Sequence, residues 1–233
     1  MFLAMVAVML VGQDTPDTAA LPSADEVVAK MVQQDDQRRA ALQGYTGVRR
    51  YVLTNSKHHK EAEMVVRMTY HKDGTKDFEV VSCTGWGSAR QHVFPRLLEA
   101  ESEASRPGSP ENSRMSPENY SFSMLRVDQI AGRKTYVIEV TPKKHKKYLM
   151  RGVIWVDAGE LAIVRMDGEP AKTPSFWIKN VHFAHEYKKH GPFWLAASDN
   201  SVTDVRIFGP TELRIDYFDY VVNDGSALEA RLP

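Results

Sequence analysis

The sequence KYLMRGVIWVDAGELAIVRMDGEPAKTPSFWIKNVHFAHEYKKHGPFWLAASDNSVTDVRIFGPTELRIDYFDYVVND, residues 147–224, consists of long runs rich in aromatic and β-branched residues. Short turns with Gly, Pro or Asp separate neighbouring runs at 157–160, 190–192 and 209–210. Connections this short join antiparallel strands, because parallel neighbours need a crossover of roughly a dozen or more residues. The stretch therefore predicts an antiparallel meander with strands at Tyr148–Val156, Leu161–Met166, Phe176–Tyr187, Phe193–Ile207 and Leu213–Val222.

The composition is that of an ordinary folded protein with balanced charge. The chain has 233 residues, of which 42% are hydrophobic, and its 30 basic and 30 acidic residues cancel. A nucleic-acid-binding protein needs a clustered basic excess, so no nucleic-acid partner is expected. No apolar run reaches the roughly 18 residues of a membrane-spanning helix. We expect one domain over residues 21–224, followed by a tail at 225–233, and a monomer.

The N-terminal residues 1–20 have the pattern of an export signal. Phe2–Val11 is an unbroken apolar run of the length of a signal-peptide core, and Thr18-Ala19-Ala20 offers small residues for cleavage. No Lys or Arg precedes Lys30, so the usual basic start is missing, and a buried N-terminal strand or helix is the alternative. We expect export to the periplasm, with the protein free or peripheral at a membrane surface.

Two amphipathic helices are predicted outside the meander. Ser23-Ala24-Asp25-Glu26 matches a capping box, and the helix that follows ends near Gly44. A second helix is expected at Ala89–Glu103, with Pro95 in its first turn or at a kink. The apolar stripe of the first helix needs a partner, and the sheet is the only large surface available; this stripe consists of Val27, Val28, Met31 and Val32.

Period-two alternation predicts further strands before the meander. In Glu61–His71 every second residue is apolar or aromatic, which is typical of a half-buried antiparallel strand. The Asp73-Gly74 pair predicts the hairpin that follows it. The expected strands are Tyr45–Asn55, Glu61–His71, Lys76–Cys83, Tyr120–Val127 and Lys134–Thr141.

No catalytic or metal-binding motif is present. His185 and His190 are five residues apart, whereas a zinc-protease helix needs four. In Gly85-Trp86-Gly87-Ser88 the serine stands in the wrong place for a nucleophile elbow. The lone Cys83 is typical of a small buried side chain. We expect no enzyme, no metal and no cofactor.

Four short motifs resemble a known family. They are GVIWVD at 152–157, AIVRM at 162–166, HGPFWL at 190–195 and IDYFDY at 215–220. Together with the order of the helices and strands over residues 23–223, they resemble the LolA/LolB-like periplasmic lipoprotein-carrier superfamily, especially its outer-membrane lipoprotein-sorting members. Ala196 stands where the family pattern has proline.

The resemblance implies a mainly β (α+β) fold. It consists of a single large antiparallel sheet curled into a half-open barrel, with two or three helices over its concave face and a cavity for acyl chains. We expect the apolar cavity wall to include Met64, Val66, Met68, Tyr70, Phe78, Val80, Tyr120, Phe122, Ile138, Trp155, Trp177 and Trp194. The alternative is that these side chains form an ordinary core without a ligand.

Five basic residues are candidates for contact with a lipid head group or a protein partner. Arg67 lies in a strand comparable to the one that carries the family's lipid-gripping arginine, and the others form a cluster after a predicted strand: Lys143, Lys144, Lys146 and Lys147. The alternative for the cluster is a solvated hairpin loop that discourages edge pairing.

Three functions remain open from the sequence. The first is a periplasmic carrier or sensor for lipid or lipoprotein acyl chains, and the second is an RseB-like envelope module that binds a protein partner. An envelope hydrolase with an unrecognised site is the third.

Overall fold

The computed structural model describes residues 21–106, 114–146, 148–172, 178–205 and 209–223. Its elements in chain order are α1 (Ala24–Ala41), β1 (Gly44–Asn55), β2 (Lys60–His71), β3 (Lys76–Gly85), a π-helical turn η1 (Ala89–Val93), α2 (Phe94–Ala104), β4 (Tyr120–Ile130), β5 (Arg133–Pro142), β6 (Met150–Asp157), β7 (Ile163–Pro170), β8 (Ile178–His190), β9 (Phe193–Val205) and β10 (Gly209–Asn223). The strands predicted from the sequence are all present, and most are a few residues longer than expected.

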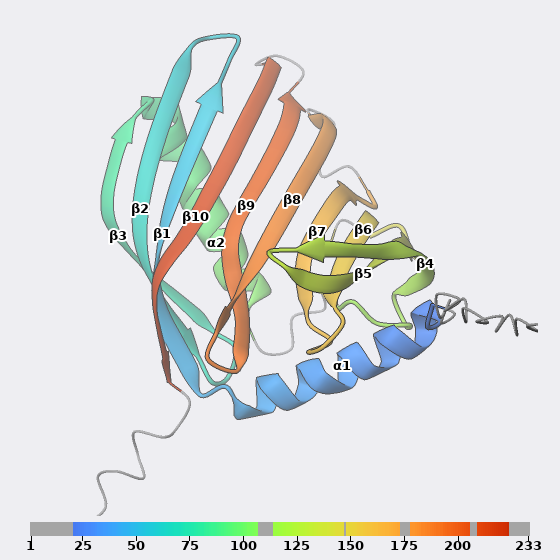
Figure 1. Cartoon of the computed structure of the whole chain (residues 1–233). Helices are drawn as coiled ribbons and strands as arrows, with labels where there is room; N and C mark the ends of the chain where they lie inside the picture. The colour runs from blue at the N-terminus through green and yellow to red at the C-terminus, as the bar shows by residue number, and fades with distance from the viewer. Residues whose placement is uncertain (1–20, 107–113, 147, 173–177, 206–208, 224–233) are drawn as a thin grey trace, which may run out of the picture.

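All ten strands form one antiparallel sheet in the order β3-β2-β1-β10-β9-β8-β7-β6-β5-β4. The meander from β4 to β10 follows chain order, and β1 pairs with β10, which adds the N-terminal strands to the far side. The sheet is strongly curled and stays open between its edge strands β3 and β4 (Figure 1). The predicted fold, a curled and half-open sheet with helices, is confirmed.

Helix α1 begins where the capping box predicts. The Ser23 hydroxyl accepts a hydrogen bond from the backbone N–H of Glu26 at 3.2 Å, and Asp25 and Glu26 place negative charge in the first turn. Arg38 and Arg39 lie in the last turn. Both arrangements favour the helix, because the helix dipole is positive at its N-terminus and negative at its C-terminus.

We expect Ser23→Ala to lower the free energy of unfolding by about 1 kcal/mol, because one of the first helical N–H groups then loses its capping acceptor. Urea unfolding followed by circular dichroism measures the difference. Ser23→Asp, which restores an acceptor, is the control and should match the wild type. A full loss in both variants would show that the serine acts in some other way.

The N-terminal half of α1 packs on one end of the sheet. Val27, Val28 and Met31 are almost fully buried there. They contact the inner face of β4–β6 in a cluster that includes Tyr120, Ile138, Val140, Leu149, Met150, Ile154 and Val156. In Figure 1, α1 runs across the open lower side of the curl from β1 toward β4. The predicted apolar stripe is therefore the surface by which α1 docks on the sheet.

Helix α2 packs on the other end of the sheet, against β1 and β2. Phe94 is fully buried and meets the Tyr51 ring edge-on at 6.4 Å between centroids, and Pro95 lies in the first turn, as the sequence predicts. The cluster around them includes Leu53, Ala62, Met64, Val66 and Ala89. None of the helices in the described part of the chain is long and apolar enough to cross a membrane. The two helices thus cover opposite ends of the same concave face.

Candidate ligand-binding cavity

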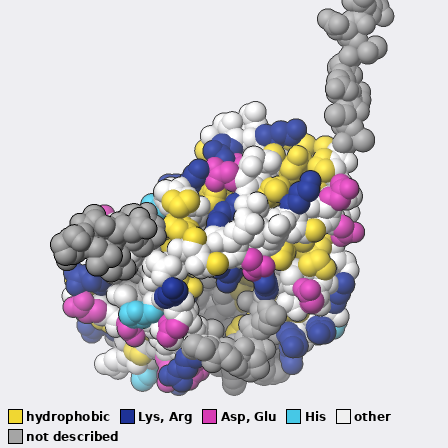
Figure 2. Space-filling view, turned by 90° about the horizontal axis from the view of Figure 1, so that it is seen from below, with side chains coloured by type: hydrophobic (Ala, Val, Ile, Leu, Met, Phe, Trp, Pro, Cys, Tyr) yellow, Lys and Arg dark blue, Asp and Glu magenta, His cyan; other side chains and the backbone are white. Residues whose placement is uncertain are grey.

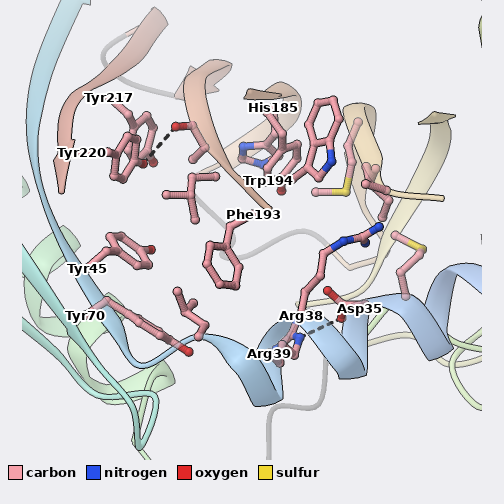
Figure 3. Close-up of a pocket in the computed structure, with 18 of the residues that line it drawn as sticks. Asp35, Arg38, Arg39, Tyr45, Tyr70, His185, Phe193, Trp194, Tyr217 and Tyr220 are labelled. Atoms are coloured by element: carbon pink, nitrogen blue, oxygen red, sulfur yellow. Dashed lines mark hydrogen bonds and ion pairs between the residues drawn. The ribbon is translucent and has the colours of Figure 1, made fainter. Parts of the chain in front are cut away.

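A cavity of about 570 Å³ lies between the two apolar clusters. Its floor is the inner face of the central strands, and the C-terminal half of α1 borders it (Figure 3). The apolar side chains that line it include Met31, Val32, Leu42, Met115, Leu161, Ala162, Ile163, Met166, Phe193, Trp194, Leu195 and Ala196. The position of the cavity follows from the α1 sequence, because the apolar stripe ends at Val32 and the polar residues that follow do not pack into the sheet.

Tyrosines dominate the end of the cavity near β1 and β10. Tyr45 stacks on Tyr70 with ring centroids 4.9 Å apart and meets Tyr220 edge-on at 5.5 Å. The Tyr220 hydroxyl donates to the carbonyl of Ala196 at 2.9 Å. Burial raises the pKa of Tyr45 to about 12 and also raises the pKa of Tyr187 and of Tyr220. These phenols therefore stay protonated at neutral pH and serve as hydrogen-bond donors.

A carboxylate on β9 joins two neighbouring strands in the cavity wall. Asp199 accepts a hydrogen bond from the Tyr217 hydroxyl on β10 and lies 2.5 Å from Nδ1 of His185 on β8. Burial, followed by the nearby Asp199 charge, raises the pKa of Tyr217. The contact fixes the imidazole in one orientation. The described residues that line the cavity include no Ser, Thr or Cys that this His–Asp pair could activate.

A buried arginine links α2 to the same wall. Arg49 on β1 is only 4% exposed, and its Nη1 donates to Glu101 of α2 at 2.7 Å. Its guanidinium lies over the rings of Phe78 and Tyr217, 5.3 and 4.9 Å from the centroids. Lys76 binds the second oxygen of Glu101 at 2.7 Å. Burial opposes the charge of Arg49, but the Glu101 carboxylate, Tyr217 and Tyr51 together outweigh it and raise the pKa of Arg49, so the guanidinium stays charged.

The C-terminal half of α1 presents two arginines at the cavity. Arg39 pairs with Asp35 one turn earlier at 2.7 Å. Arg38 donates to the backbone carbonyls of Glu160 and Leu161 in the turn between β6 and β7. Figure 3 shows Arg38 reaching from α1 toward the sheet, whereas Arg39 stays beside Asp35. The helix is thereby tied to the sheet at a second point, beyond its apolar stripe.

The structure places the predicted cavity residues in three regions. Tyr70 and Trp194 line the cavity. Met64, Val66 and Phe78 belong to the cluster under α2, and Tyr120, Phe122 and Ile138 belong to the cluster under α1. Met68 is fully buried but is not among the lining residues. Many of the residues predicted for the cavity wall therefore belong to the two apolar clusters beside the cavity, and only two of the described ones line it.

Val80 and Trp155 lie away from the cavity. Val80 is 52% exposed, because it lies on the edge strand β3, beside a bulge and with no strand on its outer side within the described residues. Trp155 lies on the face opposite Ile154, where its Nε1 donates to Asp128 at 3.3 Å and Arg165 lies over its ring. Trp177 lies outside the described residues.

The predicted basic contacts are on the surface and apart from the cavity. Arg67 is 56% exposed and pairs with Glu79 at 2.7 Å, on the face of β2 that alternates away from Met68. Lys143, Lys144 and Lys146 are exposed in the segment after β5, and Lys143 donates to the carbonyl of Pro117. Lys147 lies outside the described residues. The structure does not bring Arg67, Lys143, Lys144 and Lys146 into one site with the cavity.

Sequence reasoning missed most of the polar wall, including Arg38, Arg49, His185, Asp199 and Tyr217. One signal was available for Arg49. It has the same parity on β1 as Tyr51 and Leu53, so a charged residue stands in an apolar, inward-facing series. Such a residue needs a partner inside the protein, and a buried charge of this kind is a reason to look for a site.

No protein-family model matches the chain, and no curated protein matches it. Solved structures similar to it include a LolA superfamily protein of Nitrosomonas europaea, at 9% identity and a TM-score of 0.46, covering 84% of this chain and 93% of that one. A putative outer membrane lipoprotein-sorting protein domain from Vibrio parahaemolyticus is 13% identical with a TM-score of 0.40, covering 85% and 94%. The MucA/MucB complex of Pseudomonas aeruginosa gives 12% identity and a TM-score of 0.26, covering 84% and 95%.

Proposed function

We propose that this chain is a non-catalytic periplasmic carrier or sensor that binds an acyl chain of a lipid or lipoprotein between α1 and the central strands. The observation that carries the proposal is the 570 Å³ cavity, which lies within the range of roughly 300–1,000 Å³ that is usual for small-molecule sites. Its aliphatic and aromatic lining suits an apolar chain, since each methylene removed from water contributes about 0.8 kcal/mol.

The polar groups of the wall support binding without chemistry. Asp199 is engaged by Tyr217 and His185, and Glu101 by Arg49 and Lys76. Within the described residues no group of three or more His, Cys, Asp or Glu side chains could hold a metal ion. These pairings leave the wall stable around an empty or filled cavity, which is what a carrier that loads and releases its ligand requires.

A substitution that fills the cavity should weaken binding strongly. Val32 on α1 lines the cavity and is only partly buried, so Val32→Trp places a large side chain in the space. We expect the affinity of delipidated protein for a fluorescent fatty acid to fall at least tenfold. Fluorescence titration measures the affinity, and native mass spectrometry of protein purified from the periplasm reports any lipid that co-purifies.

Val202→Trp is the matched control, because Val202 on β9 is 47% exposed and is not among the lining residues. It should bind as the wild type does. Delipidated wild-type protein that takes up no fatty acid would refute the proposed function. Equal losses in both tryptophan variants would place the ligand outside the cavity.

A further inference from the structure

The charges that line the cavity do not cancel. Five lining side chains are basic, namely Arg38, Arg39, Arg49, Lys76 and Arg114. Four carboxylates face them: Asp35, Glu101 and Asp199 in the lining, and Asp36, which pairs with Arg114. With histidine neutral, the described lining residues together with Asp36 therefore carry one excess positive charge.

Arg38 differs from the other cations of the lining in its partners. Arg39 pairs with Asp35, and Arg49 and Lys76 share Glu101 while the Asp199 carboxylate lies on the other side of Tyr217. Among the described residues, Arg38 is the lining cation whose polar contacts include no carboxylate, because both of its partners are backbone carbonyls.

The surroundings of Arg38 do not supply the missing charge. The carbonyls that it contacts belong to Glu160 and Leu161, but the Glu160 side chain turns to other donors, Lys189 at 2.6 Å, Trp194 Nε1 at 2.9 Å and Arg133 at 3.1 Å. Seen from the side on which α1 lies, a hollow opens in the surface with charged side chains near it (Figure 2). An anion that enters the cavity meets the Arg38 guanidinium, which two carbonyls already hold in place.

We propose that Arg38 binds the acidic head group of a single-chain amphiphile, a carboxylate or a phosphate monoester, whose chain occupies the cavity. This inference rests on the proposed function and adds the chemical class of the ligand. The carbonyl contacts hold the side chain across the cavity, so little rotamer freedom is lost when the anion arrives. A guanidinium is suited to the task because it cannot lose its proton and presents five N–H donors in a fixed plane.

The test compares ligands that differ only in the head group. Dodecanoate, dodecyl phosphate and dodecanol compete for delipidated protein with N-phenylnaphthylamine, a neutral fluorescent probe that reports occupation of the cavity. We expect the two acids to bind about tenfold more tightly than the alcohol, as a charge-assisted hydrogen bond predicts. Whichever acid binds more tightly identifies the head group.

Arg38→Gln should remove this preference, so that the acids bind no more tightly than the alcohol when each affinity is compared with that for the neutral probe. Arg38→Lys keeps the charge and should restore part of the preference. Lys30→Gln is the matched control, since it removes one exposed positive charge from the same helix outside the cavity lining. It should leave every affinity unchanged.

Each other outcome has a definite meaning. Equal affinity of wild-type protein for the acids and the alcohol overturns the inference, although the acyl-chain cavity stands. A uniform loss of acids, alcohol and neutral probe in Arg38→Gln also overturns it, because Arg38 would then act only by holding α1 in place. Failure of the wild type to bind either the probe or any of the three ligands refutes the proposed function itself.

Discussion

Replacing Glu101 with glutamine is expected to lower the free energy of unfolding by about 3 kcal/mol, because Arg49 would keep its charge in a buried site without a carboxylate. Glutamine has nearly the same shape, so the effect reports the charge and not a cavity. Arg49 cannot become neutral to avoid this cost, since a guanidinium remains protonated in proteins. Lys76, which shares the carboxylate, loses its partner at the same time. Chemical denaturation at neutral pH measures the loss.

Glu63→Gln is the matched control. Glu63 pairs with Arg50, the residue next to Arg49 on the same strand, at 2.6 Å, but Arg50 is 48% exposed. Water and salt screen such a surface pair, so this variant should unfold close to the wild type. The difference between the two glutamine variants isolates the effect of burial.

A double variant separates the cost of an unpaired charge from the net value of the pair. Arg49→Met together with Glu101→Leu removes both charges and fills the site with apolar groups, so it should be more stable than Glu101→Gln alone. If instead Glu101→Gln and Glu63→Gln unfold at the same denaturant concentration, the buried charge of Arg49 does not depend on the Glu101 carboxylate for its stability.

The fold could be predicted from the sequence because its signals are local. The turns at Asp73-Gly74 and Gly191-Pro192 sit between runs with period-two alternation, and each joins two neighbouring antiparallel strands in the structure. The capping box at Ser23 gave the start of α1 for the same reason. The pairing of β1 with β10 is not local, and only the family resemblance indicated how the sheet would continue.

The candidate site could not be predicted in the same way. Apolar residues on the concave face were expected to form the cavity wall, but the helices cover that face at both ends and leave a gap only in the middle. The residues that border the gap are determined by the position of α1. They depend on where its apolar stripe ends, and on the distance between the sheet and the polar C-terminal half of the helix. Met64 and Ile138 therefore became core residues, whereas Tyr70 lines the cavity.

Irregular strand pairing is a second reason why the candidate site could not be predicted from the sequence. The register between β8 and β9 shifts between Glu186 and Tyr187, because Glu186 pairs with Ser198 and Tyr187 with Ala196, which leaves one extra residue on β9. A strict alternation over 193–205 therefore cannot be extended from one end of that strand to the other. The spacing of the histidines excluded a metal motif, but it could not reveal that His185 faces Asp199, because that contact depends on the register between two strands.

Asp157→Ala is expected to lower the free energy of unfolding by about 3 kcal/mol at neutral pH, because it removes a buried carboxylate that accepts several charge-assisted and backbone hydrogen bonds. The side chain is 2% exposed and binds Arg133 through both oxygens, at 2.6 and 3.0 Å. It also accepts from the N–H groups of Gly159 and Glu160. Asp157→Asn can still accept hydrogen bonds from the N–H groups of the turn, so it should lose less stability than Asp157→Ala.

The same carboxylate makes stability depend on pH. Burial raises the pKa of Asp157, but the hydrogen bonds from Arg133 and from the Glu160 N–H outweigh it, so the pKa lies below its ordinary value. The folded state therefore holds the proton less tightly than the unfolded state. Its contribution is complete above the ordinary aspartate pKa of about 4 and is lost as pH falls through the lower pKa of the folded state.

The stability difference between wild type and Asp157→Ala should accordingly be constant from about pH 5 to 8 and shrink below about pH 4. Urea unfolding at a series of pH values measures it, with Asp216→Ala, at the surface pair with Arg214, as the control that should show little effect. The turn that Asp157 holds also presents the carbonyls that Arg38 binds, so Asp157→Ala should weaken acid binding as well. A difference that persists unchanged to pH 3 would mean that the lost contacts do not depend on the charge of Asp157.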